Sequence, residues 1–301
     1  MQLLVYILGY PILWFISVLP FSLFYKVSDM VCFLVYRVLG YRKKVVRQNL
    51  ELSFPDKSSD ELDIIEKKFY THMCDLFLEM IKSLSLSKEE MQRRFAFTNL
   101  EIIKKFENEN RSVILVCGHY ASYEWMMSLG YHIKHQGFGI YMPLANKYFD
   151  KLVQKIRTRH GAKLIARRGS IKTIHEHYKK GYLCMYGLAS DQSPSSKRAL
   201  YWRSFMGVKV PVFTGAETLA KELDYPVVFL DIQKVKRGFY ETTFRTITEH
   251  PRDIPDYGIT DQFTEMLEGQ IREKPEYYLW THKRFKHRNK TPIPEATVSE
   301  A

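Results

Sequence analysis

Cysteine is scarce in this sequence of 301 residues. The four cysteines, Cys32, Cys74, Cys117 and Cys184, lie far apart, and no two of them form a CxxC pair. Zinc sites and dithiol redox motifs need closely spaced thiols, so the sequence gives no indication of either. We expect four free thiols in a reducing compartment.

Acidic residues are also in short supply. Asp and Glu total 33 against 45 Lys and Arg, which gives a formal net charge of +12. A basic surface favours anionic partners such as nucleic acid, anionic lipid head groups or phosphorylated substrates. We expect no nucleic-acid partner, because no nucleic-acid-binding motif is recognisable and the apolar N-terminus favours a membrane instead.

Charged residues are absent from positions 1–25, which are mostly apolar. Such a run is long enough to cross a bilayer core of about 30 Å. Pro11 and Pro20 interrupt it, so a kinked, tilted or partly immersed helix fits equally well.

A second apolar stretch, residues 30–41, is broken only by Arg37 and is followed by a basic cluster at residues 42–47. Basic residues beside a membrane segment usually lie on the cytoplasmic side. We therefore predict a membrane anchor over residues 1–41, with the remainder of the chain facing the cytoplasm. The alternative is a hydrophobic hairpin that packs on the domain without spanning anything.

The rest of the chain alternates between strand and helix patterns. Ser58 and Glu61 form a capping-box pattern before an amphipathic helix at 59–83. Strands are predicted at 112–117, 139–141, 183–188, 227–232 and 240–246, and helices at 121–133, 148–159, 170–179, 214–223 and 261–273. This alternation predicts an α/β domain over residues 42–288 with a mainly parallel central sheet flanked by helices, and a loose polar tail at 289–301.

One segment, Gly118-His119-Tyr120-Ala121-Ser122-Tyr123-Glu124, follows a predicted buried strand. His119 in the turn and Glu124 in the first helical turn can meet, and the carboxylate can then accept one imidazole N–H. The other ring nitrogen is left as a proton acceptor, which makes His119 a candidate general base for a hydroxyl nucleophile.

The chain resembles the bacterial lipid A biosynthesis acyltransferases, within the wider lysophospholipid acyltransferase superfamily. His119 to Glu124 matches the family's HX4(D/E) motif, and further matching segments follow in the family's order. They are Pro143–Asn146, Arg167-Arg168-Gly169, Ser190-Asp191-Gln192, Phe205-Met206-Gly207, Thr214-Gly215 and residues 275–286. The resemblance implies a glycerolipid acyltransferase-like fold at a bacterial inner membrane.

The resemblance also implies a reaction: transfer of an acyl group from an acyl carrier protein thioester to a hydroxyl of a glycolipid acceptor in the membrane. His119 would deprotonate that hydroxyl and Glu124 would orient the imidazole, with no covalent enzyme intermediate, metal or cofactor. Tentative substrate-binding residues follow from the same matches. They are Asn146, Arg167 or Arg168 as the oxyanion donor, Asp191, Gln192, Lys283, Arg284 and Lys286.

The acceptor is less defined than the reaction. Residues 193–205 are more aromatic and poorer in glycine than is typical of the lipid A members. An acyltransferase acting on another membrane lipid, such as a lysophospholipid, an aminolipid or another glycolipid, is the alternative.

Two other nucleophiles and one non-enzymatic role compete with this interpretation. Cys117 could share a face with His119, but a cysteine that ends an apolar strand is usually an inert core residue. Ser122 lacks the GxSxG elbow of serine esterases. A structural membrane scaffold would leave the ordered motifs unexplained.

Overall fold

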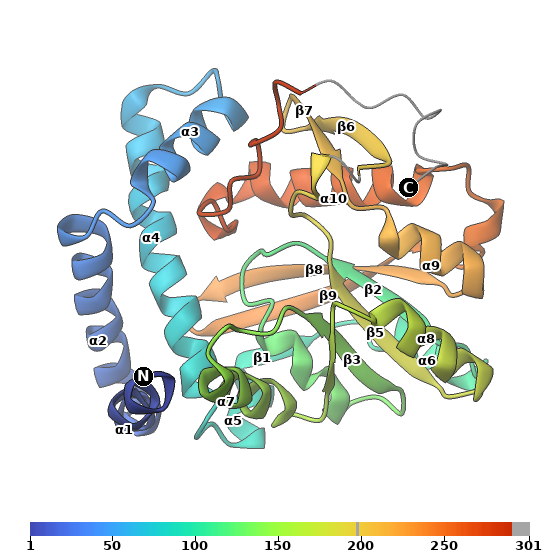
Figure 1. Ribbon diagram of the computed structural model, residues 1–301, viewed down its shortest axis with the longest axis horizontal. Coiled ribbons are helices and arrows are strands. Elements are labelled where there is room, and N and C mark those ends of the chain that lie inside the picture. Colours follow the sequence, from blue (N-terminus) through green and yellow to red (C-terminus); the bar gives the residue numbers. More distant parts are fainter. Residues whose placement is uncertain (197–198, 291–301) are drawn as a thin grey trace.

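A central seven-stranded sheet organises the protein (Figure 1). The computed structural model describes residues 1–196 and 199–290. The strand order is β1-β9-β8-β2-β5-β3-β4, and all neighbours are parallel except the antiparallel hairpin β8–β9. The bounds are β1 Phe95–Phe97, β2 Val113–Cys117, β3 Gln136–Tyr141, β4 Lys163–Ala166, β5 Cys184–Ala189, β8 Val227–Lys236 and β9 Phe239–Thr248. The predicted α/β class with a mainly parallel sheet is confirmed.

Helices cover the sheet, with α10 above it and α7 below it in the view of Figure 1. The bounds are α3 Lys43–Ser53, α4 Ser59–Lys82, α5 Lys88–Arg94, α6 Glu101–Asn108, α7 Lys147–Thr158, α8 Ser170–Lys179, α9 Gly215–Leu223 and α10 Gly258–Glu273. Short 3-10 turns η4 Pro251–Asp253 and η5 Pro275–Tyr277 flank α10. The predicted capping box is present, because the Ser58 side chain accepts from the Glu61 N–H and the Glu61 carboxylate accepts from the Ser58 N–H.

Several short elements were not predicted. They include β1, β4 and a separate hairpin made of β6 Tyr201–Phe205 and β7 Val208–Val212. The predicted helix at 121–133 is wrong in type: residues 121–124 form bends and turns, and a 3-10 helix, η2, runs over Trp125–Tyr131. The left-handed φ of 48° at Ala121 prevents a regular helix from starting there.

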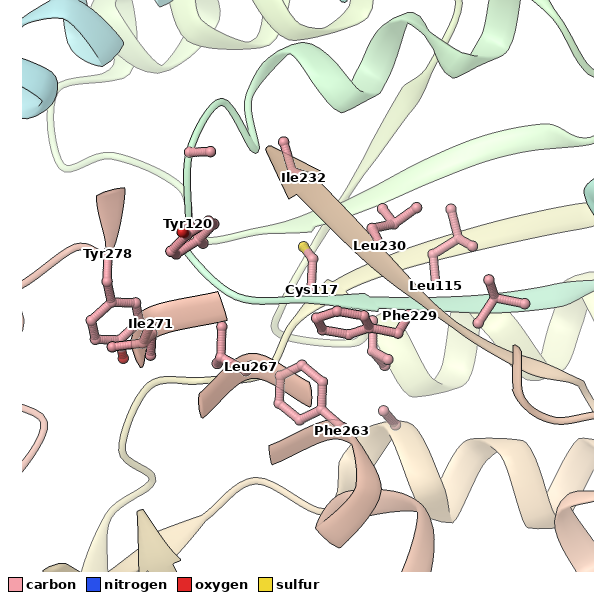
Figure 2. Close-up of a cluster of buried hydrophobic side chains, with 14 of the residues drawn as sticks. Leu115, Cys117, Tyr120, Phe229, Leu230, Ile232, Phe263, Leu267, Ile271 and Tyr278 are labelled. Carbon is pink, nitrogen blue, oxygen red and sulfur yellow. The ribbon is translucent and has the colours of Figure 1, made fainter. Parts of the chain in front are cut away.

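The core extends over both faces of the sheet, and one part of it lies between α10 and the central strands β2 and β8. Figure 2 shows Phe263 of α10 facing Phe229 of β8, with Leu267 one turn further along α10. Because β2 is buried at every position, its sequence is a continuous apolar run without alternation. This packing fixes the end of β2, where the candidate base follows.

The N-terminal segment forms two helices, α1 Gln2–Val18 and α2 Phe21–Phe33, and a π-helical turn, η1 Leu34–Val38. They lie outside α4 at the edge of the molecule (Figure 1). Across residues 1–196 and 199–290, no helix combines the length and apolar character needed to cross a membrane. The structure therefore does not support the anchor predicted for residues 1–41.

Candidate active site

The turn after β2 is held by the C-terminal segment of the described chain. The N–H of Leu279 donates to the carbonyl of His119 at 3.0 Å, and the N–H of Ala121 donates to the carbonyl of Tyr277 at 3.0 Å. Tyr120 and Tyr278 form an antiparallel bridge between these bonds. The His119 turn and the 275–286 segment, both of which match family motifs, thus contact each other although about 160 positions separate them.

Gly118 is required by close packing at the start of this turn. A Cβ atom placed on Gly118 would lie 2.5 Å from Cδ1 of Leu267, which is itself fully buried in α10. Any larger residue would push the turn away from the sheet. His119 is therefore positioned by backbone contacts on both sides.

The imidazole of His119 is hydrogen-bonded to a carboxylate from a neighbouring strand. Nδ1 of His119 lies 2.6 Å from Oδ1 of Asp191, whose side chain is 2% exposed. Asp191 follows β5, and the parallel register pairs Cys117 of β2 with Ala189 of β5. His119 and Asp191 each lie two residues beyond this pair, so both side chains emerge at the same edge of the sheet.

This geometry corrects one prediction. The carboxylate that pairs with the His119 imidazole is Asp191, and Glu124 makes no hydrogen bond to it among the described residues. The physical reason is the turn at 121–124, which replaces the helical turn that was to bring Glu124 back towards the ring.

The second ring nitrogen faces an amide. Nε2 of His119 lies 3.3 Å from Nε2 of Gln192, and the ring of Tyr123 packs edge-on against the imidazole at a centroid distance of 4.9 Å. With the Nδ1 proton donated to Asp191, Nε2 is left as the proton acceptor. Asp191 and Gln192, which the sequence placed near the site, are thus both in contact with the imidazole.

Charges around His119 favour its protonated form. Burial by itself lowers the pKa of His119, but the charge and hydrogen bond of Asp191, with a further effect of Glu124, raise this pKa above 6.5. Burial likewise acts to raise the pKa of Asp191, but the charge and hydrogen bond of His119 hold it below 3.8. The imidazolium and the carboxylate therefore stabilise each other.

Glu124 forms an ion pair with Arg157 of α7. Two bonds join the groups, Nε to Oε2 at 2.7 Å and Nη2 to Oε1 at 2.5 Å, in a parallel bidentate arrangement. The Glu124 side chain is 9% exposed and that of Arg157 24% exposed. No motif signalled Arg157, because it lies on a different helix 33 positions away from Glu124.

A cavity of about 480 Å³ lies next to these groups, within the usual size range of small-molecule sites. His119, Glu124, Arg157 and Gln192 contribute polar groups to it. The remaining lining is mostly apolar, from α4, η2, α7 and strands β3 to β5, and includes Phe77, Met80, Met126, Met127, Val153 and Leu164. The arrangement offers a base at the side of a space that suits an apolar chain.

Among the predicted binding residues, Gln192 lines this cavity, whereas Asn146, Arg167 and Arg168 lie outside the lining. Asn146 caps α7, because its Oδ1 accepts from the N–H groups of Tyr148 and Phe149. Arg167 and Arg168 are exposed just after β4, at the same edge of the sheet as His119. Neither arginine forms an ion pair with another residue in the described part of the chain.

The C-terminal cations are divided between surface and interior. Lys283 and Lys286 are exposed, whereas Arg284 is 2% exposed. The Arg284 guanidinium donates to the Ser193 hydroxyl and the Pro211 carbonyl. Its charge lies close enough to act on the Asp191 carboxylate, which indicates a supporting position behind the His119–Asp191 pair.

The two rival nucleophiles are poorly placed. Burial raises the pKa of Cys117, and its Sγ lies against Sδ of Met126 at 3.8 Å. Ser122 is completely buried. The described hydrogen bonds of the His119 ring go to Asp191 and Gln192, so neither nucleophile is paired with the base.

A buried carboxylate–imidazole pair at the carboxyl edge of a mainly parallel sheet is typical of α/β enzymes. The adjoining apolar cavity further indicates an enzyme that acts at the polar end of an apolar substrate.

Comparison with known proteins agrees with this class. A sequence model of the bacterial lipid A biosynthesis acyltransferase family matches residues 1–287. The chain is 25% identical to the lipid A biosynthesis lauroyltransferase of Escherichia coli, over 93% of this chain and 91% of the relative. It is 24% identical to the palmitoleoyltransferase of Escherichia coli, over 96% and 92%. A lipid A biosynthesis acyltransferase of Haemophilus influenzae is 25% identical over 83% and 80%.

The chain belongs to the bacterial lipid A biosynthesis acyltransferase family, and the protein is an O-acyltransferase.

Proposed function

We propose that this enzyme transfers a fatty acyl group from an acyl carrier protein thioester to a hydroxyl of a lipid A precursor or a similar glycolipid. The observation that carries the proposal is the His119–Asp191 pair, whose imidazole lines a mostly apolar cavity. Relatives named as lauroyl- and palmitoleoyltransferases of lipid A biosynthesis support both a fatty acyl group and a lipid A acceptor.

In the proposed reaction, Nε2 of His119 takes the proton of the acceptor hydroxyl while the oxygen attacks the thioester carbonyl carbon. The C–S bond of the tetrahedral intermediate then breaks, and the leaving thiolate takes the proton from the imidazolium. Asp191 keeps the other proton on Nδ1 and stabilises the imidazolium as it forms.

Glu124 is proposed as a second anionic support for the imidazolium. Its charge acts to raise the pKa of His119 without a hydrogen bond to the ring. The bidentate pair with Arg157 fixes the carboxylate in the cavity wall. Removing one partner of such a pair would leave a poorly solvated charge next to the base.

Polar donors for the substrate are proposed on both sides of the imidazole. The amide of Gln192, next to Nε2 of His119, is placed to bind the acceptor hydroxyl or the oxyanion. Arg167 or Arg168 would reach the thioester oxyanion or a phosphate from the sheet edge. The exposed Lys283 and Lys286 would bind phosphates of the acceptor or the acidic carrier protein.

The N-terminal helices are proposed to lie on the cytoplasmic face of a bacterial inner membrane. The inner face of α1 packs on α4 and α7 through Tyr6, Tyr10 and Leu13. Its outer face exposes large apolar side chains, and the same is true of α2 and η1. The exposed residues are Leu3, Leu4, Val5, Ile7, Leu8, Ile12, Trp14, Phe15, Val18, Leu23, Met30, Phe33, Leu34, Val38 and Leu39. This many exposed apolar side chains on neighbouring helices favours contact with lipid.

The same surface adjoins the cavity. Asn146 and Ala145, in the loop after β3, are hydrogen-bonded to Gln2 of α1. Met142 and Leu144 of this loop line the cavity and are exposed. A lipid acceptor could therefore pass from the bilayer surface to His119 along an apolar path.

The direct test is an acylation assay with the full chain in detergent or nanodiscs. It would use acyl carrier protein loaded with a fatty acyl group and a lipid A precursor, and compare wild type with His119→Ala. We expect transfer by the wild type and a loss of about 10²- to 10⁴-fold in a folded His119→Ala variant. Transfer retained by the variant would contradict the role of His119. Wild-type transfer only to another membrane lipid would contradict the lipid A acceptor.

A further inference from the structure

The inner end of the cavity is closed by two neighbouring methionines of η2. Met126 and Met127 line the main cavity and also a second apolar cavity of about 30 Å³. The second cavity continues away from His119 and is lined by residues such as Leu129, Gly130 and Phe138. Because both cavities share the two methionines, these side chains form the boundary between them.

A pair of glycines in the sheet makes room for the methionines. Gly139 of β3 and Gly187 of β5 are direct register partners on adjacent strands. A Cβ atom on Gly187 would lie 2.9 Å from Cε of Met126, and one on Gly139 would lie 3.2 Å from Cε of Met127. The two thioether groups therefore rest on bare sheet backbone, where any larger residue would displace them into the cavity.

Methionine suits a boundary of this kind. Its side chain is unbranched and polarisable, so it fills an irregular gap while keeping several rotamers within reach. Shortening it would join the small cavity to the large one, and filling the glycine positions would push it towards His119. Smaller residues in place of the methionines should therefore lengthen the cavity, and larger residues in place of the glycines should shorten it.

We infer that Met126 and Met127 form the inner wall of the acyl-chain channel and set the longest acyl group that the enzyme accepts. This inference rests on the proposed function, because it assumes that the thioester carbon is held at His119 with its chain directed towards η2. Each further buried methylene tightens binding about fourfold, equivalent to ~0.8 kcal/mol, until the chain end meets the wall. Longer chains should then lose affinity abruptly.

The experiment measures binding of saturated free fatty acids of increasing chain length to the full protein in nanodiscs, by displacement of a fluorescent fatty acid. Met126→Ala and Met127→Ala should move the tightest-binding length upwards by about two to three carbons, since each change removes three heavy atoms. Gly187→Ala should move it downwards. Met266→Ala, a half-buried methionine of α10 outside the cavity lining, is the matched control and should leave the length profile unchanged.

The product profile of acyl transfer with a mixture of acyl thioesters should shift in the same directions. An unchanged length profile in folded Met126→Ala and Met127→Ala variants would overturn the inference, as would a wild-type protein that binds no fatty acid. Because fatty-acid binding needs no transfer, a length profile that shifts in a protein without glycolipid acylation would refute the proposed function alone. If Gly187→Ala does not fold, the two methionine variants still decide the question.

Discussion

Replacing Asp191 by asparagine would keep the shape of the side chain and remove the negative charge next to His119. The 2.6 Å contact to Nδ1 and the 2% exposure of the Asp191 side chain make this charge the main partner of the imidazole. Without it, burial dominates, and the pKa of His119 should fall from above 6.5 to below it.

Asp191→Asn should change both the pH dependence and the maximal rate of acyl transfer. A general base must be neutral, so the wild-type rate should rise with pH through the raised pKa of His119, and this limb should move to lower pH in Asp191→Asn. The maximal rate should nevertheless fall by about 10²- to 10⁴-fold, because the asparagine can hold the wrong tautomer and cannot stabilise the imidazolium.

Stability should change with pH in a related way. A raised pKa of His119 contributes stability that is fully present below about 6.5, the unfolded value, and is lost as the pH rises through the folded value. Asp191→Asn removes this contribution. The difference in unfolding free energy between the two proteins should therefore shrink as the pH rises from about 6.5 through the folded pKa of His119.

The assay is the pH dependence of kcat/KM for acyl transfer, with unfolding followed in parallel. Asp253→Asn is a matched control, since Asp253 is exposed in η4 and distant from His119 in the fold. A wild-type rate and an unshifted pH limb in folded Asp191→Asn would refute the reasoning. If Glu124→Gln instead produced the full shift, the partner of the imidazole would be Glu124, as the sequence first indicated.

Three further predictions concern other contacts. Glu124→Gln should lower the transfer rate by about 10-fold or more and lower the melting temperature, because it leaves Arg157 unpaired. The double variant with Arg157→Met should recover part of the melting temperature, because it buries no unpaired charge, and paired rate and melting measurements test this. Gly118→Ala should destabilise the fold by about 1–3 kcal/mol in chemical denaturation, since the added Cβ would overlap a leucine of α10. Asp75→Ala should lower the free energy of unfolding by about 3 kcal/mol. This is the lower end of the range for breaking a buried ion pair, because the partner Arg237 is 35% exposed; equal stability of this variant and wild type would contradict the prediction.

Long apolar or periodic segments were the part of the fold that the sequence could predict. The buried run of β2 and the capped helix α4 were located to within one or two residues. Short elements such as β1 and β4 were missed because three or four residues carry too little periodicity to be distinguished from loops. Their position in the sheet depends on partners that lie far away in the sequence.

The N-terminal segment illustrates a different limit. Its composition indicated contact with a nonaqueous environment, and α1 exposes many large apolar side chains. Composition cannot tell that the chain turns after Val18 and packs Tyr6 and Tyr10 against α4 and α7. Whether an apolar stretch spans or lies along a surface depends on these tertiary contacts, which a hydropathy average does not contain.

The partner of His119 was missed for a reason that topology explains. Spacing along the chain favoured Glu124, five positions away, whereas Asp191 is separated by 72 positions. In a parallel sheet, however, residues equally far beyond a register pair meet at the same edge. The pair Cys117–Ala189 places His119 and Asp191 two residues beyond it on adjacent strands. A site at the carboxyl ends of parallel strands therefore depends on which strands are neighbours in the sheet. Only when β2 and β5 are known to be adjacent can Asp191 be recognised as the partner of His119.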